Sequence, residues 1–160
     1  MADYLDEFDR GILSLLLRDG RLPASHIAEQ IGLSRPAVAE RIEKLERIGV
    51  IQGTTAVIDP SAFGGCVTAF ISARKNGRLD AKAERAFLAL ADRDDVLEIH
   101  SVAGDDCYLI KVRTDSIGSL NAVVEELNGA PLLLNTRTTI VMATHCEKVG
   151  GITLSGRVES

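Results

Sequence analysis

Residues 31–53 read IGLSRPAVAERIEKLERIGVIQG, a pattern typical of an amphipathic helix with a signal at each end. Ser34 can accept a hydrogen bond from a backbone N–H group that the first turn of a helix leaves free. Gly49 can end the helix in the left-handed conformation. A shorter helix is predicted over residues 24–31, and Gly32 separates it from the longer one. Two short helices joined by a tight turn are typical of a helix-turn-helix. The apolar positions of the longer helix recur at helical spacing: Val38, Ile42 and Leu45.

The neighbouring residues extend this pair of helices into a small domain. Residues 5–18 are predicted to form a third helix that closes the core. Residues 50–60 are rich in β-prone side chains with an interruption at Gly53, and they predict a two-stranded wing. The first half of the chain is therefore predicted to be a winged helix-turn-helix. A helical hairpin that only packs is the alternative for the bare helix pattern.

Strands and helices alternate in the second half. The Asp-Pro and Gly-Gly pairs of residues 59–65 predict a linker. Strands are predicted over 66–74, 96–103, 107–113 and 133–143, and helices over 80–92 and 116–128. This βαββαβ order is that of a ferredoxin-like fold. The chain is thus predicted to be an α+β protein with four segments: a winged helix-turn-helix domain (1–58), the linker (59–65), a ferredoxin-like domain (66–148) and a C-terminal tail (149–160).

Composition limits the classes of protein to which the chain can belong. Hydrophobic residues make up 46% of it, enough for packed cores, and no apolar run is long enough to span a membrane. The acidic start lacks the features of a signal peptide, so a cytoplasmic protein is expected. The three cysteines, Cys66, Cys107 and Cys146, are widely spaced and suggest buried, reduced thiols rather than a disulfide framework.

The net charge of −5 is unusual for a protein that binds nucleic acid. Residues 1–60 contain seven Lys and Arg residues against ten Asp and Glu residues. The basic residues gather near the predicted helix-turn-helix, whereas several acids lie at the far N-terminal end. We therefore expect weak, salt-sensitive binding by one domain, and useful affinity only when several domains bind together.

A longer ordered pattern runs through the first half of the chain. It consists of Leu5-Asp6, Asp9, Ile12-Leu13, Asp19-Gly20-Arg21, Gly32-Leu33-Ser34, Arg41, Leu45-Glu46 and Gly49-Val50-Ile51-Gln52-Gly53. The pattern resembles the Lrp/AsnC (leucine-responsive/asparagine-responsive) family of transcription regulators, and the resemblance extends over residues 5–147. It implies an amino-acid-responsive regulator, not an enzyme, whose partners are double-stranded DNA, a free amino acid and further copies of the chain. In such a regulator residues 1–58 would form the DNA-binding domain, and residues 66–148 the effector and oligomerisation domain.

The helix-turn-helix predicts which residues meet DNA. The N-terminal part of the second helix of such a motif reaches base edges in the major groove, while contacts to phosphates fix its position. We expect the bases to be approached by Ser34, Arg35, Ala37 and Arg41. The phosphates are expected to be met by Arg21, Lys44, Gln52 and Thr54.

The resemblance also implies an effector site at the turn between the two central strands. Family members carry Gly-Asp-x-Asp-Tyr there, and a Thr-x-Thr on the last strand. This chain keeps the first two residues and the tyrosine, but Cys107 stands where the second acid is usual. The site is expected between dimers, for a neutral or small polar amino acid, with no catalytic cofactor. Its residues are Gly104, Asp105, Tyr108, Thr136 and Thr138; taken without the resemblance, the same residues read as a hairpin turn and a β-branched strand.

Both helices of a ferredoxin-like fold cover the same face of the sheet, which leaves the other face open. Leu109, together with Ala69 or Ile71, is expected to make that open face apolar, and an open apolar face favours a partner. We therefore expect a homodimer formed through the sheet. The family resemblance implies that these dimers assemble further, as a tetramer of dimers.

Two other classes of function stay open. The chain could be a ferredoxin-like small-molecule-binding protein that does not bind DNA. It could also be a thiol or metal sensor that uses Cys107, Cys146 and His145, although the histidines and cysteines lack metal-site spacing. No catalytic triad, phosphate-binding loop or pair of catalytic carboxylates is found.

Overall fold

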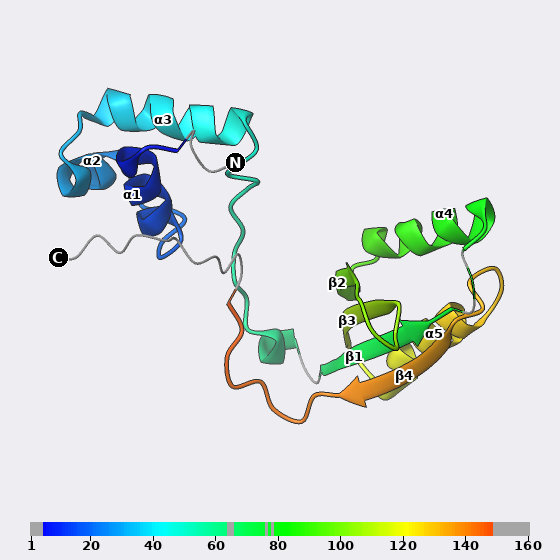
Figure 1. The fold of residues 1–160 in the computed structure, drawn as a ribbon. Helices are drawn as coiled ribbons and strands as arrows, with labels where there is room; N and C mark the ends of the chain where they lie inside the picture. The colour runs from blue at the N-terminus through cyan, green and yellow to red at the C-terminus, as the bar shows by residue number, and fades with distance from the viewer. Residues whose placement is uncertain (1–4, 64–65, 76, 78, 149–160) are drawn as a thin grey trace. The chain divides into compact units, whose positions relative to one another are not determined.

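The computed structural model describes residues 5–63, 66–75, 77 and 79–148. The described residues form two compact units, 5–58 with 147–148 and 59–146, whose elements are labelled in Figure 1. The predicted C-terminal tail, residues 149–160, lies outside the described residues.

The first unit consists of three helices: α1 (Glu7–Leu16), α2 (Ala24–Ile31) and α3 (Arg35–Arg47). Several of the helix ends are defined by a local signal. The Asp6 side chain accepts a hydrogen bond from the backbone N–H of Asp9 at the start of α1, and the two residues form a capping box. Gly32 and Gly49 have φ values of +72° and +74°, the left-handed conformation that favours glycine after a helix. The predicted helix-turn-helix is confirmed.

The core of the first unit comes from all three helices. Its buried side chains are Ile12, Leu13, Ile27, Ala28, Val38 and Leu45. The carbonyl of Leu45 also accepts hydrogen bonds from the backbone N–H groups of Val50 and Ile51, at 2.9 and 3.1 Å. These bonds turn the chain sharply after α3, so α3 is fixed at its C-terminal end as well as along its apolar face.

The prediction of a two-stranded wing over residues 50–60 is wrong, because the two strands do not form. Among the residues that the structure describes, 50–59 form neither helix nor strand. Val50 and Ile51 are used by the turn at the end of α3, which leaves a single extended stretch with no neighbouring strand. Val57 and Ile58 remain 78% and 60% exposed. High β-propensity is not sufficient here, because a strand also needs a partner to accept its hydrogen bonds.

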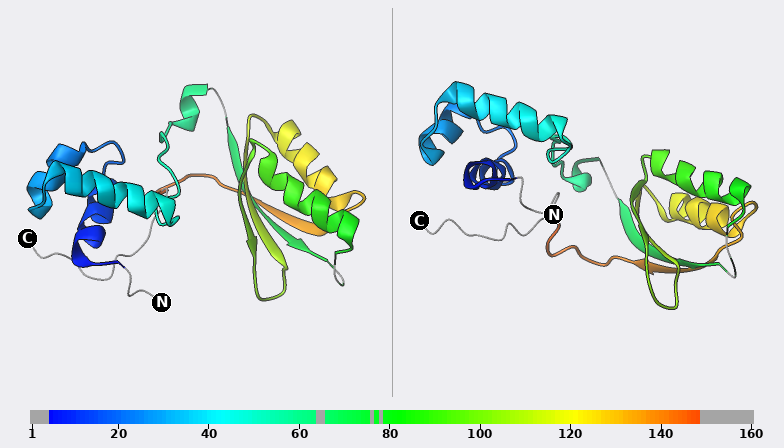
Figure 2. Two further views of the ribbon diagram at one scale, coloured as in Figure 1. Left: turned by 90° about the horizontal axis from the view of Figure 1, so that it is seen from above. Right: turned by 45° about the horizontal axis from the view of Figure 1, so that its top comes forward.

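The second unit has the predicted βαββαβ order. Its elements are β1 (Val67–Arg74), α4 (Ala81–Ala89), β2 (Val96–Ser101), β3 (Tyr108–Thr114), α5 (Ile117–Asn128) and β4 (Asn135–Ile140), with short 3₁₀ helices η1 (Pro60–Phe63) and η2 (Leu90–Asp92). The four strands form an antiparallel sheet in the order β2-β3-β1-β4. Helices α4 and α5 lie on the same face of this sheet (Figure 2). The predicted ferredoxin-like architecture is confirmed.

The core of the second unit lies between the sheet and its helices. Ala69, Ile71 and Ala73 of β1 are fully buried, and Ile71 pairs with Ile110 of β3 on the same face. The expectation that Ala69 or Ile71 lies on the open face is therefore wrong. The alternation of side chains along a strand determines which of its residues share a face, but only the packing of the helices decides which face is covered.

The open face is more polar than expected. Leu109 is half-buried and Phe70 is 36% exposed, whereas Lys111 of this face pairs with Glu98 at 2.9 Å. The same Glu98 lies 3.1 Å from His100. The hydrogen bonds to Lys111 and His100 lower the pKa of Glu98.

Two further expectations concern burial and the membrane. The three cysteines are free, but Cys66 and Cys146 are exposed and Cys107 is half-buried, so the expectation of buried thiols is wrong for the first two. None of the helices within the described ranges is both long and apolar enough to cross a membrane.

Candidate DNA-binding surface and effector site

The first turn of α3 presents the residues predicted to approach DNA bases. Ser34 caps the helix, because its Oγ accepts a hydrogen bond from the backbone N–H of Ala37 at 3.4 Å. Arg35 is the first helical residue, is exposed, and has no hydrogen-bond or ion-pair partner within the described part of the chain. Its guanidinium can therefore bind a ligand without breaking an internal contact.

Arg41, predicted at the same surface, is instead engaged by α1. Its Nη1 atom lies 2.7 Å from Asp6 Oδ2 and 2.7 Å from Asp9 Oδ1. Its Cζ atom lies 5.4 Å from the centroid of the Phe8 ring. The hydrogen bonds to Asp6 and Asp9 raise the pKa of Arg41, and the backbone N–H of Asp9, with Arg41, lowers the pKa of Asp6. Lys44, one turn later, lies 3.8 Å from Asp9 Oδ2.

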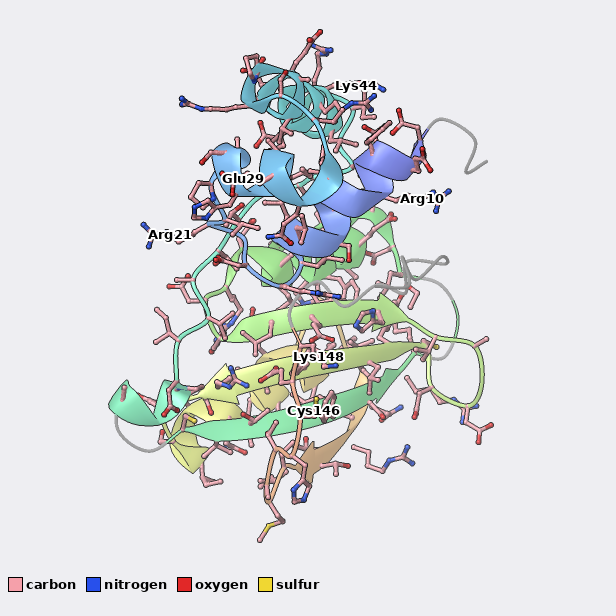
Figure 3. All side chains as sticks on the ribbon, turned by 90° about the vertical axis from the view of Figure 1, so that its left-hand side faces the viewer. Arg10, Arg21, Glu29, Lys44, Cys146 and Lys148 are labelled. Carbon is pink, nitrogen blue, oxygen red and sulfur yellow. The ribbon has the colours of Figure 1, made fainter. Side chains whose placement is uncertain are left out.

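The predicted phosphate contacts fall into two groups. Arg21 is exposed, and Figure 3 shows it projecting into solvent from the turn before α2. Thr54 lies against this turn, because a Cβ atom at Gly20 would come within 2.9 Å of its methyl group. Arg21 and Thr54 are thus brought close together, with the exposed Gln52 two residues before Thr54. Lys44 belongs to the ion-paired group around Asp9.

Beyond its first turn, the exposed surface of α3 is largely acidic. Glu40, Glu43 and Glu46 are exposed there, against the exposed Arg47 near the C-terminal end. Carboxylates repel the phosphates of DNA, so the N-terminal turn with Arg35 is the part of α3 best suited to face DNA.

The hairpin end of the second unit carries three of the predicted effector residues. Gly104 has a φ of +141°, and both it and Asp105 are exposed in the turn between β2 and β3. The turn is anchored to β1, because the backbone N–H of Cys107 donates to the carbonyl of Ala73 at 3.0 Å. Tyr108 faces α4, where its ring centroid lies 4.2 Å from that of Phe87.

The other two predicted effector residues lie on β4. Thr136 pairs with Ala73 of β1 and Thr138 pairs with Ile71. Tyr108 pairs with Ala73 from the opposite side, so β1 separates both threonines from the hairpin in one chain. The Thr136 hydroxyl donates to Asn128 Oδ1 at 3.0 Å, whereas Thr138 is exposed.

A cavity of about 590 Å³ lies beneath the hairpin end, between α4 and the sheet. Its lining includes Lys75, Leu79, Glu84, Phe87, Cys107 and Tyr108. Sequence reasoning identified Tyr108 but missed Glu84 and Phe87. Glu84 and Phe87 are three residues apart on a predicted helix and so share a face. The sequence does not show, however, that this face meets Tyr108 of β3.

The thiol or metal sensor finds no support in the geometry. Within the described residues, no three His, Cys, Asp or Glu side chains form a group able to hold a metal ion. Cys146 is exposed and Cys107 is 3.9 Å from the carbonyl of Lys75, the acceptor for its thiol.

Comparison with family models matches both units. Residues 5–46 match an AsnC-type helix-turn-helix domain, and residues 68–150 match the Lrp/AsnC ligand binding domain.

Characterised proteins and solved structures agree with these matches. The chain is 34% identical to the HTH-type transcriptional regulator FL11 of Pyrococcus abyssi over 148 residues, which is 92% of this chain and 95% of the relative. It is 33% identical to the leucine-responsive regulatory protein of Escherichia coli over 86% of this chain and 85% of the relative. A feast or famine regulatory protein of Mycobacterium tuberculosis, complexed with L-methionine, superimposes with a TM-score of 0.81 at 32% identity, over 93% of this chain and 99% of that one.

Proposed function

This chain belongs to the Lrp/AsnC family of DNA-binding transcription regulators that respond to amino acids, and we propose which surfaces perform the two tasks. The first turn of α3 reads promoter DNA. An amino acid bound at the hairpin end of the second unit controls that binding. The family consists of regulators rather than enzymes, so the output is a change in DNA occupancy, in the compartment that holds the DNA.

The assignment of DNA reading to α3 rests on Arg35 at the start of this helix. Its guanidinium is exposed and has no partner in the described part of the chain. Arginine at such a position can donate two hydrogen bonds to guanine in the major groove. Ser34 and Ala37 flank it at the base edges. Phosphate contacts are assigned to Arg21, Lys44, Gln52 and Thr54, which position the helix without specifying sequence. Arg41 is left out of this contact set, because its guanidinium is bound by Asp6 and Asp9.

The test of DNA reading is fluorescence anisotropy with a promoter fragment from upstream of the protein's own gene. A scrambled fragment of equal length and composition is the control. Preference for the promoter fragment is expected, together with a steep loss of affinity as salt is raised. Equal, weak binding to both fragments would favour the small-molecule-binding alternative.

For the effector, Asp105 can accept a charge-assisted hydrogen bond from the ammonium group of a free amino acid. Backbone N–H groups at Gly104 and the hydroxyls of Thr136 or Thr138 can donate to its carboxylate. Since β1 separates the two threonines from the hairpin in one chain, we place the site where the hairpin of one copy meets β4 of another, with Tyr108 behind the turn. The methionine complex of the M. tuberculosis relative supports a neutral amino acid as the ligand class.

The effector is identified by a thermal-shift screen of the twenty amino acids, followed by calorimetry with the best ligand. Asp105→Ala is expected to abolish binding. Asp94→Ala is a matched control, because it removes an exposed carboxylate next to the opposite end of β2. Unchanged affinity in Asp105→Ala means that the pocket lies elsewhere. A preference for lysine or arginine would contradict the inference drawn from Cys107, which stands where an acid is usual in the family.

For assembly, we propose a homodimer through the open face of the sheet and further closure into a tetramer of dimers. Leu109 and Phe70 are the large apolar side chains that support this face as an interface. The ion pairs around Glu98 give it a polar pattern that a second copy can match. Light scattering at micromolar concentration tests this assignment, and a monomer there would refute it.

A further inference from the structure

Among the described residues of the first unit, the carboxylate of Asp9 is the most buried charge, with only 1% of its side chain exposed. Arg41 of α3 is paired with it at 2.7 Å, and Lys44 lies 3.8 Å from its second oxygen. We propose that Arg41 is a positioning residue, which fixes α3 on α1 through Asp9 and Asp6 and so sets how the first turn of α3 meets DNA, without touching DNA itself. The inference rests on the proposed reading of DNA by α3.

The contacts join the middle of α3 to the first turn of α1 at one point. A single atom, Nη1 of Arg41, lies 2.7 Å from an oxygen of both Asp6 and Asp9. The two carboxylates also cap α1 reciprocally, through backbone N–H bonds of 2.8 and 3.4 Å. The guanidinium stands 5.4 Å from the centroid of the Phe8 ring, a distance suited to a cation–π contact. Three side chains at the start of α1 thus converge on one side chain of α3.

Burial of Asp9 keeps Arg41 in place. A buried carboxylate is costly unless it is paired and hydrogen-bonded. If Arg41 turned outward to a phosphate, Asp9 would retain only the 3.8 Å contact with Lys44 and the 3.4 Å hydrogen bond from the backbone N–H of Asp6. The 28% exposure of the Arg41 side chain also leaves little of it available for a ligand.

Because Arg41 lies in the middle of α3, it can influence where Arg35, at the start of the helix, lies relative to the DNA bases. Arg35 lies six residues before it, about 9 Å along the helix axis at 1.5 Å per residue. A small tilt of α3 about this anchor moves Arg35 relative to the base edges, and hydrogen bonds to bases tolerate only small displacements. Loss of the anchor is therefore expected to weaken sequence preference even though no DNA contact is removed.

The test is a double-mutant cycle of Arg41→Ala and Asp9→Asn, read by anisotropy on the promoter and scrambled fragments at several salt concentrations. Each single variant is expected to reduce the preference for the promoter fragment by about tenfold. The double variant is expected to be no worse than the weaker single one, because both act through the same contact. The slope of log affinity against log salt is expected to stay unchanged, since no phosphate contact is lost.

A direct DNA contact by Arg41 predicts opposite results. Arg41→Ala would then flatten the salt slope by about 0.9. Asp9→Asn would strengthen binding, because it would release Arg41 and remove a negative charge. Either outcome overturns the proposal.

Asp6→Asn keeps the inference testable if a substitution at Asp9 unfolds the unit. Asparagine is as good a helix cap as aspartate, and the Asp6 side chain is 48% exposed, so the fold should survive while one partner of Arg41 loses its charge. A two- to threefold loss of preference with an unchanged salt slope is expected, and stronger binding would refute the proposal. The control Arg35→Ala distinguishes base reading by α3 from the positioning of α3 by Arg41. If it leaves preference intact, reading by α3 is wrong; if it abolishes preference while the Arg41 and Asp9 variants do not, only the positioning role is wrong.

Discussion

Replacing Arg35 by alanine isolates the proposed base contact. The guanidinium is exposed, and no partner for it exists among the described residues. Alanine at the first helical position keeps the Ser34 cap and the Pro36 that follows it. The unfolding free energy of the unit should therefore change by less than about 0.5 kcal/mol, the range of ordinary surface substitutions.

The loss in binding follows from the contact itself. A bidentate arginine–guanine pair contributes about 1–3 kcal/mol of discrimination, or roughly 5- to 150-fold in relative affinity at 25 °C. Affinity for the scrambled fragment should fall much less. Arg21→Ala is the matched comparison, because it removes an exposed guanidinium expected at a phosphate. It should weaken both fragments alike and reduce the salt slope by about 0.9.

Anisotropy titrations of both variants on both fragments, with a thermal melt of each protein, provide the measurement. Equal losses on the two fragments in Arg35→Ala would refute the base contact and make Arg35 one more phosphate contact. Unchanged binding in both variants would remove this face of the unit from the DNA interface.

The remaining predictions concern assembly, packing and pH. Leu109→Asp should convert the assembly to monomers by light scattering without lowering the melting temperature of the monomer, whereas Leu88→Asp, at a 65% exposed position on α4, should leave the assembly intact. Phe87→Ala should cost about 3–5 kcal/mol of unfolding free energy in denaturant titrations, because Phe87 is 7% exposed and its ring centroid lies 4.2 Å from that of Tyr108 on β3; a cost below about 1 kcal/mol would contradict this packing. The pKa values of Asp6 and Asp80 are both lowered, chiefly because each carboxylate accepts a hydrogen bond from a backbone N–H group. The unfolded chain therefore takes up protons first, and melting temperatures should fall as pH drops below about 5; Asp80→Asn should make that fall shallower, and an unchanged acid profile in this variant would exclude Asp80 from the effect.

Local signals made the helix-turn-helix predictable. Ser34 as a cap, Gly32 in the turn and Gly49 after α3 each act within a few residues, so the sequence around each one contains the whole cause. The same holds for the alternation along β1, which places the buried residues 69, 71 and 73 on one face.

Features that depend on distant residues were not predictable in the same way. The β-prone stretch after α3 forms no strand among the described residues, because no second strand lies beside it. The expectation that Ile71 lies on the open face is wrong, because the sequence does not show which side of the sheet the helices cover. The cavity beneath the hairpin needs Glu84 and Phe87 of α4 to meet Tyr108, a contact between residues more than twenty positions apart.

The assignment of Arg41 shows why a basic residue on a recognition helix is ambiguous. Its spacing from Arg35 and Lys44 suggests a DNA-facing set, but its partners Asp6 and Asp9 come from a helix 35 and 32 residues earlier. Charge counted along the sequence treats these acids as opponents of DNA binding. In the folded unit they are largely neutralised by Arg41 and Lys44, so they repel DNA less than their number suggests.

These ion pairs also reduce the number of cations that the first unit can offer to DNA. The same ion pairs that mask Asp6 and Asp9 withdraw Arg41 and part of Lys44 from the cations available to phosphates. Further exposed acids lie on α3 beyond its first turn, and on α1, on α2 and between those two helices: Glu40, Glu43 and Glu46, with Glu7, Glu29 and Asp19. A single unit therefore has few cations facing DNA and a short reading surface, which limits its affinity whatever the net charge of the chain. Binding through several linked units raises the effective concentration of each one without any new contact. The charge distribution of one unit thus supports, independently of the sheet face, an assembly of several copies as the form that binds DNA.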